Sequence, residues 1–335
     1  MKPVRIAQIG VNDNSHGTAI YQTIKELPEI FELVGIAFPE NEKELIPDKV
    51  NKLGEYKELT LDEILSDPSI EAVAVETDEI YLTKYAQLAA DAGKHIHMEK
   101  PGGLDLAAFT HLVDTVKGKN LIFSVGYMYR FNVYIMELMR RIEAGELGEI
   151  VSIEAQMSCW HPEKKRHWLN IFPGGMMFFL GCHLTDLVYR ILGEPERIIP
   201  LNKSTGMDGV TADDFGMAVL EYKNGVSFVK ATDIERGGYM RRQFVVIGTK
   251  GTVELRPFEV DTGGPDRLTG KREVFDTAWS ADAEFTYSEP IGRYDRMMIS
   301  FADCVRGNKE NPYTPDYELG LYKTILKTCG VNENV

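Results

Sequence analysis

Short apolar segments in the first third of the chain predict strands, and the stretches between them show helical periodicity. The predicted strands cover residues 4–11, 32–38, 70–75, 95–98 and 121–127. The predicted helices cover residues 18–27, 79–92 and 105–116. Strands that alternate with helices predict an α/β domain with a doubly wound parallel sheet.

The pattern changes after about residue 126, where strands follow one another with fewer helices between them. Strands are predicted at 150–157, 217–222, 226–231, 244–247 and 252–255, with a hairpin turn at Asn224-Gly225. Helices are predicted at 132–143, 176–192, 293–305 and 317–327. This pattern predicts an α+β domain on a largely antiparallel sheet. The segment Asp261–Arg272, rich in glycine and charge, is predicted to be a mobile loop.

Charge and composition disfavour some classes of binding partner. The chain has 335 residues and a formal net charge of −14, which opposes binding to nucleic acid or to anionic membranes. No apolar run approaches the length of a membrane span, and Met1–Arg5 leads directly into a strand without a signal-peptide segment, so we expect a cytoplasmic protein. The four cysteines are widely spaced, which favours reduced thiols over a disulfide framework.

Lys100 is the first candidate for chemistry. The segment His95–Met98 alternates as a half-buried strand does and is followed by Glu99, Lys100 and Pro101. Ligands bind at the carboxyl edge of an open α/β sheet, so a lysine there can face a bound molecule. Desolvation lowers the pKa of an ammonium group, which can then accept a proton from a hydroxyl and return it. The alternative is a solvated lysine at a strand end.

The turn after the first predicted strand is a candidate nucleotide site. Backbone amides at the start of a helix bind pyrophosphate, and Gly10 fits the first glycine of such a turn. Asn12 stands where a second glycine is usual, and Phe38 stands where an acid would contact the ribose, with Glu40 two residues later. Both a nucleotide site and a plain strand-to-helix turn remain open.

A second group of polar residues lies in the later domain. His183 and Asp186 are three residues apart on a predicted helix, so the carboxylate could orient the imidazole. Upstream lie aromatic and polar residues that could pack on sugars or cofactors: Trp160, His161, Arg166, His167, Trp168 and Asn170. A buried core histidine and a solvated loop are the alternatives. The spacing of the histidines matches no standard metal site, and we predict no metal.

An ordered set of motifs extends over nearly the whole chain: Glu99-Lys100-Pro101, Gly126–Phe131, Gly145–Ile150, Gly174-Gly175, Gly181–Asp186 and Gly248–Gly251. In this order the set resembles the glucose-fructose oxidoreductase and inositol dehydrogenase family, written Gfo/Idh/MocA. The resemblance implies a dinucleotide-binding Rossmann domain, placed at residues 1–126. It also implies a substrate-binding and oligomerisation domain with a large open sheet, placed at residues 127–335.

The resemblance also implies roles for single residues. Lys100 would transfer the proton of a substrate hydroxyl, His183 would share it, and the Lys100–Pro101 bond would be cis. The expected cofactor site comprises Gly10, Val11, Asn12, Ser15, His16, Phe38, Thr77, Asp78, Glu99, Lys100 and Pro101. The expected substrate site comprises Tyr127, Arg130, His167, Trp168, Phe179 and Asp186. The cofactor would be NAD rather than NADP, because the negative charge of Glu40 disfavours a 2′-phosphate.

The implied activity is hydride transfer between a nicotinamide and a carbinol carbon of a sugar, cyclitol or glycoside-like substrate, in a homodimer or homotetramer. Phe179 departs from the family, which usually carries an aspartate four residues before the histidine. This departure, with Asn12 and Phe38, supports an alternative in which the protein binds a ligand or regulates without turnover. A third hypothesis is NAD-assisted glycoside cleavage.

Overall fold

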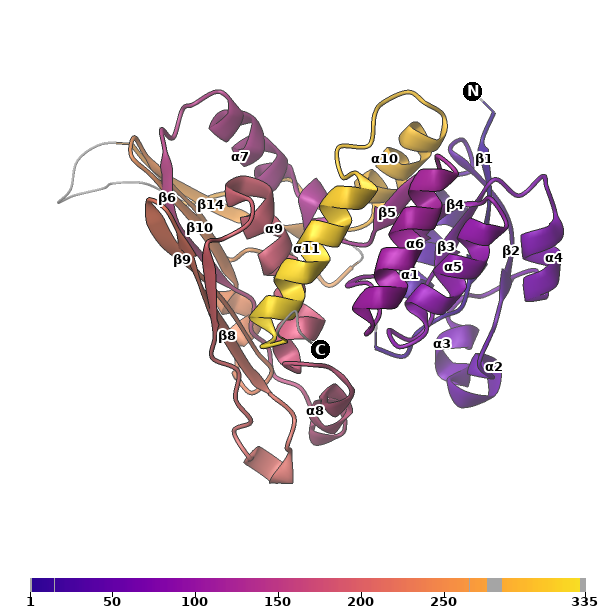
Figure 1. Cartoon of the computed structure of the whole chain (residues 1–335), viewed down its shortest axis with the longest axis horizontal. Helices are drawn as coiled ribbons and strands as arrows, with labels where there is room; N and C mark the ends of the chain where they lie inside the picture. The colour runs from indigo at the N-terminus through magenta and orange to yellow at the C-terminus, as the bar shows by residue number, and fades with distance from the viewer. Residues whose placement is uncertain (1, 15, 265, 276–284, 332–335) are drawn as a thin grey trace. The chain divides into compact units, whose positions relative to one another are not determined.

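The computed structural model describes residues 2–14, 16–264, 266–275 and 285–331, and the chain divides into two compact units (Figure 1). The first unit comprises Met1–Met128 and Tyr294–Tyr322, and the second comprises Tyr129–Arg293 and Lys323–Val335. The domain limits of 1–126 and 127–335 stay a prediction. The units differ from them because helix α10 (Asp295–Val305) packs on α1 (Gly17–Glu26) in the first unit.

The first unit is built on a sheet of parallel strands in the order β2-β1-β3-β4-β5. The strands are β1 (Val4–Ile9), β2 (Phe31–Ala37), β3 (Ala72–Val75), β4 (His95–Met98) and β5 (Phe123–Val125). A further parallel bridge joins Ile36 of β2 to Glu58, so the segment between β2 and β3 adds a vestigial strand at that edge. The resulting order is that of a Rossmann domain, in which ligands bind where the winding reverses between β1 and β3.

Helices cover both faces of this sheet. Besides α1 and α10 they are α2 (Glu42–Leu45), α3 (Pro47–Asn51), α4 (Leu61–Ser66), α5 (Leu82–Asp91), α6 (Leu106–Gly118) and α11 (Pro315–Thr328), whose last residues belong to the second unit. In Figure 1, α5 and α6 lie side by side over the strands. The sequence did not predict α2, α3 and α4, which are too short to show a periodicity. A capping box between Thr60 and Glu63 begins α4.

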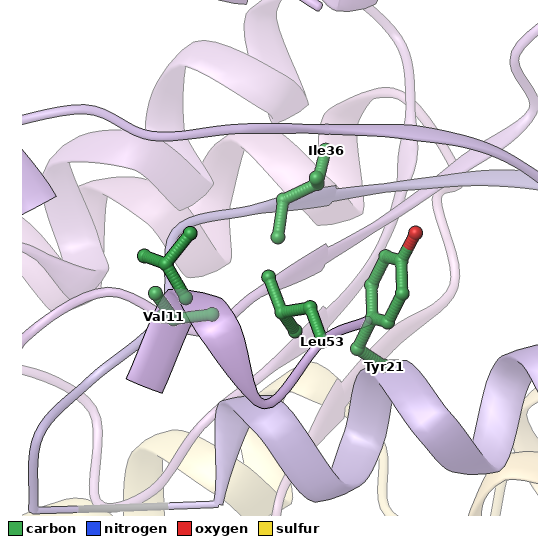
Figure 2. Packing of buried hydrophobic residues seen from close by; sticks show 5 residues of the cluster. Val11, Tyr21, Ile36 and Leu53 are labelled. Carbon is green, nitrogen blue, oxygen red and sulfur yellow. The ribbon is translucent and has the colours of Figure 1, made fainter. Parts of the chain in front are cut away.

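A small hydrophobic cluster supports the turn after β1. It comprises Val11, Tyr21, Ile36, Val50 and Leu53, which are at most 5% exposed (Figure 2). Val11 lies two residues after the end of β1, and the other members come from α1, β2, α3 and the segment after α3. The packing therefore fixes the backbone of the turn from the side of the β2 edge.

The second unit contains an eight-stranded sheet in the order β15-β14-β11-β10-β6-β9-β8-β7, antiparallel except for the β6–β9 pair. Its strands are β6 (Ile150–Gln156), β7 (Arg197–Pro200), β8 (Phe215–Tyr222), β9 (Gly225–Thr232), β10 (Gln243–Gly248), β11 (Thr252–Leu255), β14 (Gly270–Val274) and β15 (Thr286–Tyr287). The predicted hairpin joins β8 to β9. The fold class, a Rossmann domain followed by a mostly antiparallel sheet, is confirmed.

Helices α7 (Val133–Glu143), α8 (Glu163–Trp168) and α9 (Cys182–Leu192) belong to the second unit. The predicted helix over 176–192 is not uniform, because Met177–Gly181 forms a wider π-helical turn before α9. The segment Asp261–Arg272, predicted to be a mobile loop, is partly strand among the described residues, while residues 262–264 and 269 lie outside strands. Its strands are the end of β12 (Val260–Asp261), β13 (Asp266–Leu268) and the start of β14, and a small sheet joins β12, β13 and β16 (Ile291–Gly292). Among the described residues, no helix is both long and apolar enough to cross a membrane.

Truncating Leu53 is expected to weaken the first unit. Leu53 is fully buried in the cluster of Figure 2, so Leu53→Ala leaves a cavity and should lower the free energy of unfolding by about 2–4 kcal/mol. Urea unfolding followed by circular dichroism measures the change. Leu45→Ala is the matched control, because Leu45 on α2 is 73% exposed and its loss should change the free energy by less than about 0.5 kcal/mol. Equal effects of the two variants would contradict the packing described.

Candidate active site

The turn after β1 is pressed against the segment that follows β3. Gly10 has a φ of +84°, and a Cβ there would lie 2.5 Å from Thr77 Cγ2 and 2.8 Å from Glu42 Oε1. Gly17, the first residue of α1, also lies close, since its Cβ would be 3.0 Å from Glu76 Cβ. Gly10 therefore requires glycine, whereas a side chain at Gly17 would need Glu76 to move slightly, so that glycine there allows the close helix–sheet packing of a nucleotide turn.

Two amide side chains fix the shape of this turn. The Gln8 side chain donates to the carbonyls of Gly10 (2.9 Å) and Gly17 (3.0 Å) and so joins the two ends of the turn. Asn12 accepts from the Asn14 N–H (2.7 Å) and donates to the Thr77 carbonyl (3.2 Å). Asn12, where a second glycine was expected, thus holds the turn to the segment after β3.

The beginning of α1 has the features of an anion site. Its N-cap residue, His16, contributes no capping side-chain hydrogen bond among the described residues, and its ring packs on Tyr294 with centroids 5.3 Å apart. The first amides of a helix bind phosphate groups. Ser15, also expected in the cofactor site, lies outside the described residues.

Glu42 is the acid that reaches this turn. Its carboxyl group accepts a hydrogen bond from the Val11 N–H (3.0 Å), and burial raises its pKa from 4.5 to about 8. The sequence reasoning considered only Phe38 and Glu40 at the end of β2. Phe38 instead packs against the hydrophobic cluster and Tyr56. The signal that was missed is the acid at the start of α2, four residues after Phe38.

Glu40 lies at the same edge of the sheet, where it forms an ion pair with Lys84. Its carboxylate accepts hydrogen bonds from Lys84 and from the Tyr85 hydroxyl (2.6 Å), and these bonds lower its pKa. The charge of Glu40 is therefore partly neutralised, which weakens the argument that it repels a 2′-phosphate.

Lys100 lies buried at the carboxyl end of β4. It is 2% exposed, which contradicts the alternative of a solvated lysine. Its Nζ lies 4.0 Å from Glu99 Oε1, and its backbone N–H donates to the same oxygen (3.1 Å). The Lys100–Pro101 bond is cis, as the resemblance implied, and the Pro101 carbonyl accepts a hydrogen bond from the buried Tyr127 hydroxyl (3.4 Å).

Two further acids near Lys100 were missed by the sequence reasoning. Glu76 and Glu79 follow β3 and are fully buried. Burial raises the pKa of Glu79 to about 7 and that of Glu76 well above its usual range, while the ammonium of Lys100 opposes both shifts. The missed signal is the run Glu76-Thr77-Asp78-Glu79 directly after an apolar strand.

His97, on β4, lies next to one of these acids, Glu76. Its Nε2 lies 3.7 Å from Glu76 Oε1, and complete burial lowers its pKa to about 4. At neutral pH the imidazole is therefore uncharged and does not compensate the Glu76 carboxyl group, whose charged form burial disfavours.

In the second unit, Arg130 and Asp186 form a buried ion pair. Both Nε and Nη2 of Arg130 donate to Asp186 Oδ1, at 2.9 and 2.7 Å. Asp186 therefore holds the guanidinium group of Arg130, and the expected orientation of His183 by Asp186 stays a prediction. The pair joins the segment before α7 to α9, and removal of one partner from such a pair typically costs about 3–5 kcal/mol.

His183 packs against Tyr129. The two rings are perpendicular with centroids 5.1 Å apart. The Tyr129 hydroxyl donates to Glu259 (2.8 Å), which also binds Arg242 and Arg293, and burial raises the Tyr129 pKa. Arg242, Glu259 and Arg293 are far from Tyr129 in the sequence, and no pattern predicted that they meet. Only Tyr129 belongs to a motif that the sequence analysis identified, Gly126–Phe131.

Phe179 belongs to an aromatic cluster. Its ring contacts Trp168 edge to face at 5.1 Å and stacks on Phe172, while Lys165 Nζ lies 4.8 Å from its centroid. A lysine over an aromatic face is a cation–π contact. His167 is more exposed and lies 3.4 Å from Glu163.

The structure thus brings the expected residues into two sets. The first set lies at the carboxyl ends of β1 and β3 and contains Gly10, Asn12 and Thr77, with Asp78 next to Thr77. The neighbouring β4 is followed by Glu99, Lys100 and Pro101. The second unit holds His183, Arg130, Asp186, Trp168 and Phe179. The pairing of Lys100 with His183 stays a prediction. Within the described residues, no three His, Cys, Asp or Glu side chains are arranged to bind a metal.

Comparison with known protein families gives two successive matches. Residues 4–127 match "Oxidoreductase family, NAD-binding Rossmann fold", and residues 135–254 match "GFO/IDH/MocA C-terminal domain". Both belong to one family, which the motifs had indicated.

The single proteins that match this chain differ from it at most aligned positions. The chain is 30% identical to the uncharacterized oxidoreductase YhhX of Escherichia coli K12, over 57% of this chain and 54% of that protein. The alignment thus spans about half the length of that relative. A D-xylose 1-dehydrogenase (NADP(+)) of Haloferax volcanii is 28% identical over 78% of each chain. The structure of levoglucosan dehydrogenase in complex with NADH and levoglucosan superimposes with a TM-score of 0.77 over 98% of each chain, at 21% identity, which shows a shared fold.

The buried Glu42 carboxyl group makes the stability of the first unit depend on pH. The folded state raises the pKa from 4.5 to about 8, so it binds this proton more tightly than the unfolded chain. Stability contributed by the proton is therefore complete below pH 4.5 and is lost as the pH rises through 8. Glu42→Gln keeps a neutral acceptor for Val11 and should be more stable than the wild type at pH 8.5, by up to about 5 kcal/mol.

Urea unfolding at pH 5 and pH 8.5 measures this difference. Glu44→Gln is the matched control, since Glu44 lies exposed on the same helix and its removal should leave the pH dependence unchanged. A gain in Glu42→Gln that is equal at both pH values would contradict the assigned titration.

Proposed function

Because the chain belongs to the Gfo/Idh/MocA family of oxidoreductases, we propose that it transfers hydride between a nicotinamide cofactor and a carbinol carbon of a sugar-like substrate. The observation that carries this proposal is the buried Lys100 at the carboxyl end of β4, at the same edge of the parallel sheet as the turn that follows β1. The substrate class is supported by relatives named for D-xylose and levoglucosan.

The residues of the first unit fit a dinucleotide. Gly10 allows the turn after β1 to lie close to Thr77, the start of α1 can receive the pyrophosphate, and Glu42 reaches the turn where a ribose hydroxyl would bind. When bound, the nicotinamide supplies the acceptor or donor of the hydride. We favour NAD, because Glu42 places a carboxyl group at this turn that can bind a ribose hydroxyl, although one relative is named for NADP(+).

Residues of the chain accept and return the proton of the substrate hydroxyl. When a carbinol is oxidised, the Lys100 amine accepts the proton of the hydroxyl, and the nearby Glu99 carboxylate stabilises the ammonium that forms. In the opposite direction Lys100 returns the proton to the oxygen. His183 is proposed as the group of the second unit that shares this proton. Trp168 and Phe179 offer apolar ring surface for a sugar, and Lys165 lies against the Phe179 ring.

Phe179 is the observation that favours a second candidate. It places an aromatic ring where the family usually has an aspartate, so the second unit carries no acid at that position. A protein that binds the cofactor and a sugar without turnover, as a sensor or regulator, would show this feature. Cleavage of a glycoside with catalytic rather than stoichiometric use of NAD is the enzymatic variant of the main proposal.

Lys100→Met is expected to separate chemistry from binding. The wild type should reduce NAD or NADP with at least one member of a panel of aldoses, polyols, cyclitols and anhydrosugars. The variant should lose about 10²–10⁴-fold in kcat, because the proton acceptor is gone. Cofactor binding, measured by calorimetry, should change by less than about threefold.

Lys52→Met is the control, since Lys52 is an exposed lysine of the same unit. Unchanged turnover in Lys100→Met would refute the assigned role of Lys100. Cofactor binding by the wild type without hydride transfer to any member of the panel would instead support the ligand-binding alternative.

A further inference from the structure

A buried carboxyl group in the second unit lies beside a histidine that the proposed reaction does not yet use. Asp233 follows β9 directly and is fully buried. Neither of its carboxyl oxygens has a hydrogen-bond partner among the described residues. Its Oδ2 lies 3.5 Å from Nδ1 of His161, whose side chain is 22% exposed. The two residues thus form a dyad in which the acid is closed to solvent and the imidazole is partly open to it.

Backbone contacts hold the two residues of this dyad together. The His161 N–H donates to the Asp233 carbonyl (2.8 Å), and the Asp233 N–H donates to the Asp214 carbonyl (3.2 Å). Trp160 and Ile234, the neighbours of the two residues, form an antiparallel bridge. The segment after β6 is therefore paired with the segment after β9, and both side chains of the dyad start from fixed backbone.

Asp233 determines which nitrogen of the imidazole carries the proton. A buried carboxylate without a hydrogen-bond donor is unfavourable, so Nδ1 of His161 supplies the N–H and Nε2 keeps its lone pair. Contacts of this length commonly shorten when a substrate binds. The Cys159 thiol lies 3.6 Å from Nε2, and burial raises its pKa to about 11. It therefore stays a neutral, weak donor that a hydroxyl group can displace from Nε2.

The dyad lies next to the aromatic residues proposed for the substrate. Arg166, buried on α8, donates to the His161 carbonyl (3.2 Å) and so fixes this helix at the dyad. The same helix carries Lys165 and Trp168, which both contact the Phe179 ring. Ring faces and an acceptor nitrogen thus occur in one part of the second unit. Sugars are bound by this combination, with rings against C–H groups and polar atoms against hydroxyls.

We propose that His161, oriented by Asp233, binds a hydroxyl group of the substrate through Nε2. The inference rests on the proposed function, and it names the acceptor that replaces the aspartate which Phe179 lacks. The preferred substrate is then a sugar or polyol with a free hydroxyl besides the reacting carbinol, because its deoxy analogue leaves Nε2 without a donor. His161 is a specificity-determining residue, and Asp233 is a positioning residue that acts through it.

The first test measures the tautomer of His161 in the protein alone. The ¹⁵N signals of labelled histidine are recorded at pH 8, and His161→Phe identifies those of His161. We expect the proton on Nδ1 in the wild type. Asp233→Leu removes the acceptor and should move the proton largely to Nε2. Asp233→Asn keeps an acceptor of the same shape and should preserve the Nδ1 form.

Glu149→Gln is the matched control for this test and should leave the tautomer unchanged. Glu149 is an exposed acid directly before β6, whereas His161 follows that strand. A wild-type His161 with its proton on Nε2 overturns the inference, whether or not the protein is an enzyme. So does a tautomer that does not respond to Asp233→Leu.

The second test measures substrate selection. The best substrate among aldoses, polyols, cyclitols and anhydrosugars is compared with its monodeoxy analogues. His161→Phe should raise the KM for this substrate by about 10–100-fold and change kcat by less than about threefold, because a binding contact is lost. It should also remove the discrimination against one analogue. His161→Gln keeps an acceptor and should restore part of the affinity.

His111→Phe is the control, since His111 is exposed on α6 of the first unit. Turnover with an unchanged KM in His161→Phe overturns the inference alone. If the wild type binds a sugar of the panel by calorimetry without turnover, weaker binding in His161→Phe supports the inference while the proposed function fails. A wild type that binds no member of the panel overturns both.

Discussion

The close approach of two chain segments, the turn after β1 and the turn after β3, is the constraint on which the first unit depends. Gly10 has no Cβ because Thr77 and Glu42 occupy that space, and Gly17 lies against Glu76 for the same reason. Asn12 then joins the two turns through the Thr77 carbonyl and the Glu79 carboxyl group. This contact fixes the start of α1, and it also determines which side chains are excluded from water beside Lys100.

Exclusion of water has a clear electrostatic consequence. Burial favours the neutral forms of Glu42, Glu76 and Glu79, and it keeps His97 uncharged at neutral pH. A formally acidic site thus carries much less negative charge than its sequence indicates. The second unit follows a different rule, since there Asp186 is paired with Arg130, and Glu259 is paired with Arg242 and Arg293. These two carboxyl groups therefore lie against guanidinium groups, although burial still raises the pKa of Asp186.

The sequence predicted what depends on local pattern. Most strands of the two large sheets, the place of Lys100 at the end of β4 and the hairpin at Asn224 follow from alternation and turn chemistry, whereas β7, β14 and β15 were not predicted. It could not predict contacts that depend on register between distant strands, such as the approach of Glu79 to Asn12 or of Glu259 to Tyr129. Asp186 shows the difference, because its spacing on a helix indicated only His183 as a neighbour, whereas the folded chain also brings Arg130 to its carboxylate.

The return of residues Tyr294–Tyr322 to the first unit makes the second unit, in sequence, largely an insertion into the first. During synthesis the ribosome therefore releases most of the second unit before the segment that contains α10 and completes the first. Arg306, which binds Glu71 at the beginning of β3, arrives at the same late stage. The surface of α1 that α10 covers therefore stays open on the nascent Rossmann sheet until residues 294–322 have been made.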